Sequence, residues 1–335
     1  MPDQASGKAF GTADTARGDG GEPAVRVEGL WKRFGEQVAV HGIDLVLPAG
    51  KFIGLVGPNG AGKTTTLSMI TGLLRPDTGR VLVAGHDVWA GPESVARVKA
   101  RIGILPEGLR LFERLSGREL LAYTGRLRGL PGAEVDKRAA QLLDVLGLSG
   151  SQHKLVVDYS TGMRKKIGLA AALLHNPEVL FLDEPFEGVD PVSAQTIRGV
   201  LERYTASGAT VVFSSHVMEL VESLCDWVAV MAAGRIRAQG PLAEVRGTAP
   251  SLQAAFLELV GANGRDAAGD SLDWLGGGGG SGGGRTGSTG DGTGTADAGA
   301  STGTGTGAGA GAGASTTRGT ATGTGTDTDT TDGAR

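Results

Sequence analysis

Short apolar runs divide this chain into predicted β-strands. Residues 52–56, 179–182 and 210–213 are nearly unbroken apolar stretches, and they are followed by glycine, by two acids and by two serines, respectively. Runs of this length are typical of strands that are buried on both faces of a parallel sheet. We therefore predict three strands of one sheet at these positions.

Two other patterns accompany these runs. Residues 25–47 alternate apolar and polar positions (AVRVEGL, DLVL) and residues 80–85 are RVLVAG, which predicts a small antiparallel sheet with one face covered. Between about residues 109 and 158, apolar residues recur at helical spacing (ELLAYTGRLRGL, AAQLLDVLGL), which predicts a helical subdomain. The pattern as a whole predicts an α/β fold with a mostly parallel sheet. A final amphipathic helix is predicted from Leu252, Phe256, Leu257 and Val260.

Glycine is abundant, with 59 of 335 residues, but it is unevenly spread. From about Gly276 the chain consists almost wholly of Gly, Thr, Ala, Ser and Asp without apolar periodicity, and residues 1–22 are similar. Such segments cannot bury enough apolar surface to offset the entropy lost on ordering. We predict disorder for residues 1–22 and 265–335. The folded part, residues 23–264, is large enough for one domain or two tightly joined ones.

The overall composition limits the classes of function. A formal net charge of -4 gives no support for nucleic-acid binding. Cys225 is the only cysteine in the sequence, so no internal disulfide can form, which suits a reducing cytoplasm. No apolar run approaches the roughly 18 residues that are needed to span a bilayer. A role at a membrane would therefore require a membrane-spanning partner.

A phosphate-binding loop follows the first apolar run, because GPNGAGKT, which starts at Gly57, matches G-x-x-x-x-G-K-[ST]. Its glycines let the backbone wrap around phosphate, and a helix predicted over residues 65–74 would point N–H groups at the anion. Lys63 would reach the β- and γ-phosphates, and Thr64 would bind Mg²⁺. A glycine-rich turn with a chance lysine is the alternative, which its placement between strand and helix disfavours. The predicted binding residues are Gly57, Pro58, Asn59, Gly60, Ala61, Gly62, Lys63, Thr64 and Thr65.

Polar residues follow the second and third apolar runs, at one edge of the predicted sheet. In open α/β sheets, ligands bind at the carboxyl ends of the strands. Asp183 suits the Mg²⁺ shell, and Glu184 is placed to polarise an attacking water. A single carboxylate at a strand end is ordinarily a solvated rim residue, but two acids in a chain with a phosphate loop favour catalysis. His216 ends the SSH after the third run, and we expect it to contact the γ-phosphate, although a lone histidine is usually structural.

The order of these motifs resembles the nucleotide-binding subunit of an ATP-binding-cassette (ABC) transporter. Over about residues 25–260, GPNGAGKTT resembles the Walker A loop, LFLDEP the Walker B strand with the catalytic glutamate, and SSH the switch histidine. GVDP resembles the D-loop at Asp190, and Phe34 matches the aromatic residue that stacks on adenine. The phosphate loop alone is shared by many NTPases, whereas the ordered set is specific to this family. The resemblance implies a P-loop NTPase core, ATP and Mg²⁺ as cofactors, and ATPase activity.

YSTGMRKK, residues 159–166, stands where the family has its LSGGQ signature. In this family two subunits pack head to tail, and the signature of one closes over ATP on the phosphate loop of the other. Ser160 and Gly162 match the signature residues that contact the γ-phosphate. Departures from the family pattern occur at Tyr159, Thr161 and Met163.

Three basic residues, Arg164, Lys165 and Lys166, follow the signature residues. They are candidates for phosphate ligands, or they lie on a solvated helix face. The solvated face is the more ordinary location for consecutive charged residues of a helix, and we expect it here.

A further departure from the family pattern is Glu107, in RIGILPEGLRLF, where the family usually has glutamine. The resemblance implies that this loop contacts Mg²⁺ or the attacking water and senses the membrane partner, and a glutamate can still bind Mg²⁺. GILPE together with S-x-G-M-R-x-K looks like the ABC-2 export group, which includes antibiotic-resistance and sodium-extrusion ATPases. A loop carboxylate without a role is the alternative for Glu107.

The resemblance implies an ATPase subunit on the cytoplasmic face of the membrane that powers export through separate transmembrane permease subunits. One set of motifs per chain means that two subunits, expected to be a homodimer, would complete the ATP sites. Two other classes stay open: a soluble ABC ATPase that acts on ribosomes or DNA, and a nucleotide-gated scaffold without catalysis.

Overall fold

The computed structural model describes residues 22–261. The two segments for which we predict disorder therefore lie outside the described residues, apart from Glu22. The domain bounds drawn from the sequence stay predictions.

Six strands form the main sheet, in the order β10 (Arg235–Pro241), β9 (Trp227–Ala232), β3 (Phe52–Val56), β8 (Thr210–Ser215), β7 (Val179–Asp183) and β6 (Ile102–Leu105). Neighbours are parallel except for β10, which is antiparallel to β9. The three strands predicted from apolar runs are confirmed. The second and third continue beyond their predicted ends because Asp183 still pairs with Ser214 across the sheet.

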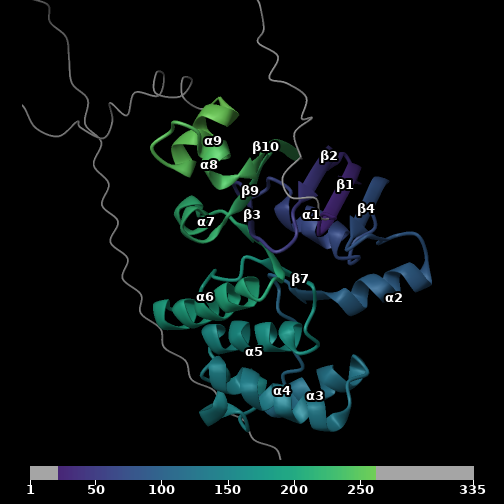
Figure 1. Cartoon of the computed structure of the whole chain (residues 1–335), viewed down its shortest axis with the longest axis vertical. Helices are drawn as coiled ribbons and strands as arrows, with labels where there is room; N and C mark the ends of the chain where they lie inside the picture. Colours follow the sequence, from purple (N-terminus) through teal and green to yellow (C-terminus); the bar gives the residue numbers. More distant parts are fainter. Residues whose placement is uncertain (1–21, 262–335) are drawn as a thin grey trace, which may run out of the picture. The chain divides into compact units, whose positions relative to one another are not determined.

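A second sheet contains β2 (Gln37–Leu47), β1 (Val25–Phe34), β4 (Thr78–Val83) and β5 (His86–Asp87), in this order, and is antiparallel. Its residues alternate as predicted, since Val25 and Val27 are buried whereas Arg26 and Glu28 are exposed. Helix α1 (Lys63–Ile70) contacts β2 and β4 as well as β7. The phosphate-loop helix therefore packs between the two sheets (Figure 1).

Helix α1 differs at both ends from the helix predicted over residues 65–74. It begins at Lys63, because Gly62 in the left-handed conformation (φ 99°) turns the loop directly into the first helical turn. It ends at Ile70, because Thr71 caps the helix and the left-handed Gly72 (φ 77°) then redirects the chain.

The helical region predicted for residues 109–158 holds α3 (Gly117–Leu127), α4 (Gly132–Val145) and two 3-10 turns, Ser149–Ser151 and Val156–Asp158. Ser116 and Glu119 form a capping box that starts α3. Helices α3 and α4 pack on each other and on α5 (Thr161–Leu173), which in turn contacts β6 and α6 (Pro191–Ala206) (Figure 1). Helix α5 thus connects this region to the main sheet.

The remaining helices are α2 (Pro92–Arg101), α7 (Met218–Leu224), α8 (Leu242–Arg246) and α9 (Leu252–Val260). Helix α9 confirms the predicted final helix: Leu252 is buried and Phe256 is partly buried, whereas Leu257 and Val260 are exposed. None of the helices within residues 22–261 is both long and apolar enough to cross a membrane.

Alternate residues of the main sheet enter two separate apolar cores, one on each face. Leu180 and Leu182 of β7 belong to the core that contains residues of α3, α4, α5 and α6. Phe181 of the same strand belongs to the core under α1 and the antiparallel sheet. The carboxyl ends of β3, β7 and β8 are thereby held rigidly from both sides, which fixes the residues that follow them.

Candidate active site

The loop between β3 and α1 depends on glycine at its start and at its end. A Cβ at Gly57 would lie 2.1 Å from the carbonyl oxygen of Met231 in β9, so only glycine lets the start of the loop approach β9 this closely. Gly62 is left-handed, and a Cβ there would lie 2.6 Å from the carbonyl oxygen of Ala39. The loop is therefore packed against β2 and β9, and its geometry is set by neighbours far away in sequence.

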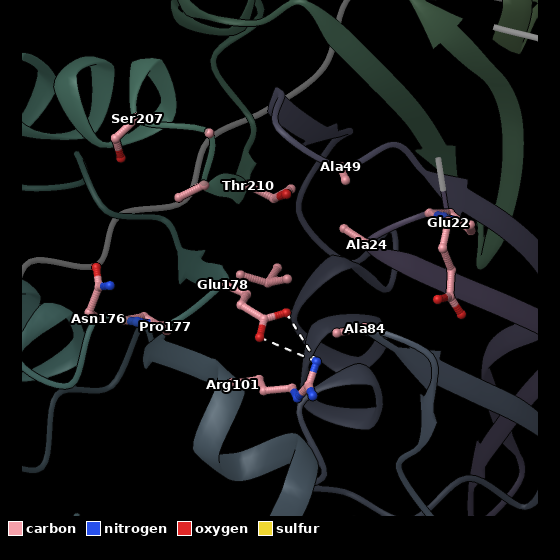
Figure 2. Close-up of a pocket in the computed structure, with 14 residues that line it drawn as sticks. Glu22, Ala24, Ala49, Ala84, Arg101, Asn176, Pro177, Glu178, Ser207 and Thr210 are labelled. Carbon is pink, nitrogen blue, oxygen red and sulfur yellow. Dashed lines mark hydrogen bonds and ion pairs between the residues drawn. The ribbon is translucent and has the colours of Figure 1, made fainter. Parts of the chain in front are cut away.

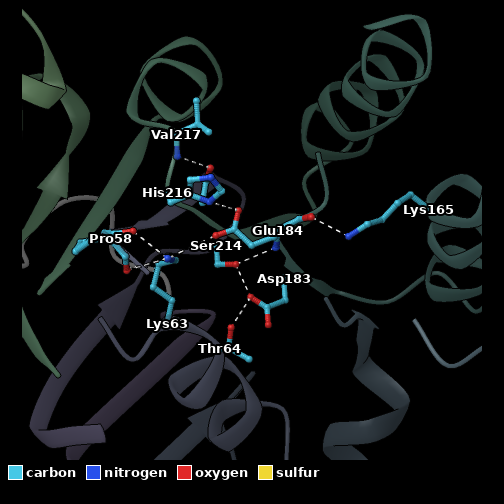
Figure 3. A network of polar contacts seen from close by, with 11 residues as sticks. Pro58, Lys63, Thr64, Lys165, Asp183, Glu184, Ser214, His216 and Val217 are labelled. Atoms are coloured by element: carbon cyan, nitrogen blue, oxygen red, sulfur yellow. Dashed lines mark hydrogen bonds and ion pairs between the residues drawn. The ribbon is translucent and has the colours of Figure 1, made fainter. Parts of the chain in front are cut away.

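Lys63 lies at the first position of α1 with its side chain 6% exposed. Its ammonium donates to the carbonyl oxygens of Gly57 (2.9 Å) and Pro58 (3.3 Å), and lies 3.5 Å from Oε1 of Glu184 (Figure 3). The lysine is thus held beside the loop and beside the acid that follows β7. A cation in this position is placed to bind an anionic group on the loop.

Asp183, at the end of β7, is joined to the phosphate-loop helix. Its Oδ1 accepts hydrogen bonds from the hydroxyls of Thr64 (3.2 Å) and Ser214 (2.5 Å). Ser214 in turn accepts from the backbone N–H of Glu184 at 2.9 Å (Figure 3). This is possible because β8, which carries Ser214, lies between β3 and β7.

Ser214 is a site residue that sequence reasoning missed. The SSH motif drew attention to its histidine, while the serine was assigned to the end of an apolar strand. The only signal was a polar residue at the same edge as Asp183, and its meaning depends on which strands are neighbours. Ser214 holds the side chain of Asp183 and the backbone N–H of Glu184, so we expect it to fix the geometry of both acids.

Glu184 is a buried acid in an unusual backbone conformation. Its φ of 45° is left-handed, which costs a residue other than glycine about 1–3 kcal/mol. Its Oε2 lies 3.2 Å from Nδ1 of His216, whose side chain is 36% exposed. The carboxylate is therefore held between Lys63 and His216. The contact of His216 with a γ-phosphate stays a prediction.

A cavity of about 580 Å³ opens at this edge of the main sheet. It is lined by most of the phosphate loop together with Phe34 from β1, Glu107 after β6, Glu184 and His216. The ring of Phe34 is half exposed, as stacking requires, and carries the ammonium of Lys32 5.6 Å from its centroid. Sequence reasoning missed other lining residues, for which no motif gave a signal: Gln37, Val38, Ala39, His41, Glu187, Ala233 and Gly234.

The oxygen atoms at the site fit a divalent cation of the Mg²⁺ type. Thr64 and Asp183 bring a hydroxyl and a carboxylate together, and Glu107 lines the same cavity. Within residues 22–261, no group of three or more His, Cys, Asp or Glu side chains is placed to hold a metal by itself. Mg²⁺ commonly binds through one or two carboxylates plus substrate phosphates, and this donor set suits that mode.

The signature-like residues lie outside this cavity. Ser160 is the N-cap of α5, where its hydroxyl accepts from the N–H of Met163 (3.3 Å). Gly162 is buried, and a Cβ there would lie 2.7 Å from Oδ2 of Asp190, which caps α6 through the N–H of Ser193 (2.9 Å). The structure thus brings Gly162 and Asp190 together but does not place them, or Ser160, among the residues that line the cavity of their own chain.

Tyr159, which replaces the leucine of the family signature, is buried. Its hydroxyl donates to the carbonyl oxygen of Ser151 at 2.8 Å, and burial raises the pKa of the phenol. The departure from the family pattern therefore packs the signature segment against the 3-10 turn Ser149–Ser151.

The solvated face expected for the three basic residues of α5 is wrong for two of them. Lys165 and Lys166 are 6% and 8% exposed, because this face of α5 packs toward α6 and the segment after β7. Lys165 donates to the carbonyl oxygen of Glu184 at 2.8 Å (Figure 3). Arg164 is partly exposed and pairs with Glu113 at 2.8 Å. The three consecutive basic residues did not indicate in the sequence that two of them are buried, because their burial depends on how α5 packs.

Another cavity, of about 440 Å³, lies near the amino ends of β7 and β8, where Val179 and Thr210 line it. Its main polar feature is the ion pair of Arg101 with Glu178, at 3.3 Å (Figure 2). It is therefore at the opposite edge of the sheet from the phosphate loop, and none of the predicted site residues lies there.

The names of the matching family model and of two relatives refer to ABC transporters and to ATP-binding proteins of resistance or export. A family model described as "ABC transporter" matches residues 40–187. The chain is 39% identical over 216 residues to the linearmycin resistance ATP-binding protein LnrL of Bacillus subtilis, a match that covers 64% of this chain and 68% of that one. It is 40% identical over 223 residues to the Nod factor export ATP-binding protein I of Ralstonia nicotianae, covering 67% and 68%.

The fold is also similar to a solved structure described as the ATP binding subunit of an ABC transporter. The TM-score is 0.65 at 29% sequence identity, and the match covers 71% of this chain and 99% of the other. The predicted P-loop NTPase fold, with its mostly parallel sheet, is confirmed.

Proposed function

The chain belongs to the ABC transporter family, and from this premise we propose that it powers export through separate membrane-spanning subunits. It is an ATP-binding protein and an ATPase, as the members of this family are. Export is supported by relatives whose names refer to drug resistance and to Nod factor export. The observation that carries the proposal is a single cavity in which a phosphate loop, a buried acid and a histidine meet.

ATP binding is proposed for this cavity. Phe34 stacks on the adenine, and the amides of residues 57–65 together with Lys63 hold the phosphates. Thr64 and Asp183 would hold Mg²⁺, with Glu107 as a further candidate ligand. When bound, the cation neutralises negative charge on the phosphates. This arrangement explains why Thr64 and Asp183 share a hydrogen bond even though they belong to different strand–loop units.

Hydrolysis is proposed to depend on Glu184 as the group that polarises the attacking water. Its carboxylate is almost fully buried and fixed by Lys63 on one side and His216 on the other. General-base assistance of this kind contributes about 10²–10⁴-fold to the rate. Ser214 holds the backbone of Glu184 and the side chain of Asp183 at once, so the metal-binding and water-binding acids keep one mutual geometry.

A dimer of the chain, most simply a homodimer, is proposed as the active form. Ser160, Gly162 and Asp190 lie outside the cavity of their own chain, which supports a role toward the nucleotide of a second subunit. Closure of the two subunits over ATP would then move the attached membrane-spanning subunits. We place the protein at the inner face of the cell membrane through those partners.

Glu184→Gln tests the proposal. The amide keeps the shape of the side chain but cannot act as a base, so hydrolysis should fall by about 10²–10⁴-fold while ATP binding persists. An ATP-bound dimer should accumulate and be visible by size-exclusion chromatography. Glu178→Gln, which changes an exposed glutamate at the opposite edge of the sheet, is the matched control and should hydrolyse ATP at the wild-type rate.

The catalytic assignment would be contradicted if Glu184→Gln still released phosphate and no ATP-bound dimer accumulated. A wild-type chain that binds but never hydrolyses ATP would instead favour the nucleotide-gated scaffold. The membrane role is tested separately, by detergent extraction of the tagged chain from its own cells. Co-purification of a multi-spanning membrane protein supports export, and recovery of ribosomal or DNA-associated proteins alone would contradict it.

A further inference from the structure

Lys165 is a buried cation that has no role in the proposed hydrolysis as described above. It lies in the second turn of α5 and is 6% exposed. Among residues 22–261 its hydrogen bond goes to one atom, the carbonyl oxygen of Glu184, at 2.8 Å. Burying an ammonium is costly unless its charge is compensated, so the position has to be explained.

The compensation comes from a cluster of acids. The pKa of Lys165 is lowered by burial, and the carboxylates of Glu187, Glu107, Asp183 and Glu184 counteract part of that effect. These acids come from the end of β7 and from the segments after β6 and β7. Lys165 is therefore the cation from α5 that faces the acidic edge of the site, across from Lys63 on α1 (Figure 3).

The backbone of Glu184 needs such support. A left-handed conformation at a residue other than glycine persists only where its surroundings hold it. The Glu184 N–H is held by Ser214, and its carbonyl oxygen accepts from Lys165 and from the N–H of Glu187 (3.3 Å). Lys165 is the one of these partners that comes from a separate helix.

We propose that Lys165 is a positioning residue that fixes the carbonyl group, and thereby the carboxylate, of Glu184 in its hydrolytic orientation. The inference rests on the proposed role of Glu184 in polarising water. Lys165 acts through Glu184, and it is not among the residues that line the cavity. Because Ser160 caps the start of α5, the same helix joins the signature segment to the acid of its own chain.

Lys165→Met in the full transporter complex tests the proposal, since methionine keeps the length and removes both charge and donor. We expect kcat to fall by about 10- to 100-fold, because a displacement of about 1 Å at a reacting group costs this much. KM for ATP should stay within about twofold of wild type, because the nucleotide contacts are kept. Lys165→Arg keeps the cation and donors and should recover most of the lost rate.

Lys166→Met is the control for loss of a buried lysine from the same helix. If both methionine variants lower kcat and the melting temperature alike, Lys165 has only a packing role and the proposal is overturned. It is also overturned if Lys165→Met hydrolyses at the wild-type rate while Glu184→Gln is inactive. Should Glu184→Gln itself hydrolyse normally, the proposed role of Glu184 fails instead, so the two failures can be told apart.

The pH dependence of kcat is a readout that packing alone would not move. Lys165 loses its proton at a lower pH than an ordinary lysine, and its bond to the carbonyl oxygen of Glu184 weakens when the charge is lost. The rate should therefore decline toward alkaline pH in the wild type. In Lys165→Arg, whose guanidinium stays charged, this decline should shift to higher pH. An alkaline decline that is the same in both proteins would contradict the proposal.

Discussion

Helices α1 and α5 both have a small N-cap residue and a glycine at or near their start, yet their first turns are built differently. Helix α1 has no side-chain cap, because Gly62 leads into it in a left-handed conformation, and its first residues line the cavity. Helix α5 is capped by its own serine, Ser160, and its first turn packs against the start of α6 through Gly162. A similar sequence pattern therefore produces one uncapped helix start and one capped start.

The two constructions of the first turn determine how each helix can bind a phosphate. Uncapped N–H groups at the start of α1 are available to an anion that enters the same chain's cavity. At α5 a side chain already satisfies one N–H, so a ligand there meets a hydroxyl and the remaining N–H groups. This suits a turn that completes the nucleotide site of a second subunit rather than one that forms the nucleotide site of its own chain. Substitutions in each turn separate the two roles.

Of the changes to these two turns, Lys63→Ala should have the largest effect, because it removes the cation of the turn that holds the nucleotide. Hydrolysis should fall by about 100- to 1000-fold, as when other preorganised donors are removed. Binding of a fluorescent ATP analogue to the isolated chain should weaken as well. Lys51→Ala, at an exposed lysine just before β3, is the control and should bind normally. Equal binding by both variants would contradict the assignment of α1.

Gly162→Ala should affect the other turn without affecting nucleotide binding by the isolated chain. The added Cβ would lie 2.7 Å from Asp190 and 2.8 Å from Ser193, so the turn has to shift. We expect about 100-fold slower hydrolysis by the complex, which a displacement of about 1 Å can cause. Gly199→Ala, in α6, adds a methyl group in open space and should behave as wild type. If Gly162→Ala weakened ATP binding by the isolated chain while Gly199→Ala did not, the first turn of α5 would belong to the nucleotide site of its own chain, which would contradict the proposal.

Ser160→Ala removes a cap and, by our proposal, a contact to the partner's nucleotide. Loss of the cap should lower the free energy of unfolding by about 1 kcal/mol. Loss of one hydrogen bond to a charged group should slow hydrolysis by the complex by about tenfold. Ser251→Ala removes the equivalent cap of α9 and should lose similar stability at full activity. If the two variants hydrolyse ATP equally, Ser160 serves only as a cap.

The smallest expected effect is on the pH dependence of stability, and it concerns Asp190, whose side chain lies close to Gly162. The Ser193 N–H holds the pKa of Asp190 below its ordinary value of 3.8. A carboxyl whose pKa is lower in the folded state contributes its full stabilisation above the unfolded-state pKa, and this contribution is lost as pH falls from there through the lower folded-state pKa. Asp190→Asn can still cap α6 but does not titrate, so its melting temperature should fall less than that of the wild type between about pH 6 and pH 3. Equal falls would show that this cap does not depend on the charge.

The sequence predicted the strands and the loop well, for a physical reason. Apolar runs followed directly by polar residues indicate a buried strand and its end without knowledge of its neighbours, and Lys63, Asp183 and Glu184 all follow such runs. Ser214 and Lys165 could not be predicted in this way. The role of Ser214 depends on β8 lying between β3 and β7, and that of Lys165 on which face of α5 is covered.

The ends of α1 were predicted less well than the strand before it. The expected helix was displaced toward the C-terminus, because the sequence does not show that Gly62 is left-handed or that Gly72 turns the chain. Both conformations are set by contacts with other segments, such as the approach of Gly62 to Ala39. Local pattern thus indicated which residues matter, while tertiary contacts decided where the helix starts and stops.

The order of strands in the main sheet has a consequence for biosynthesis. Strand β3 leaves the ribosome early, but both strands that pair with it, β8 and β9, are made much later. At a translation rate of about 5–20 residues per second, roughly 10 to 35 seconds separate Val56 from the completion of β9. Until then Gly57 has no Met231 to pack against. The nucleotide loop is therefore translated early but reaches its packed conformation late, and during this interval the apolar strand before it lacks both of its partner strands.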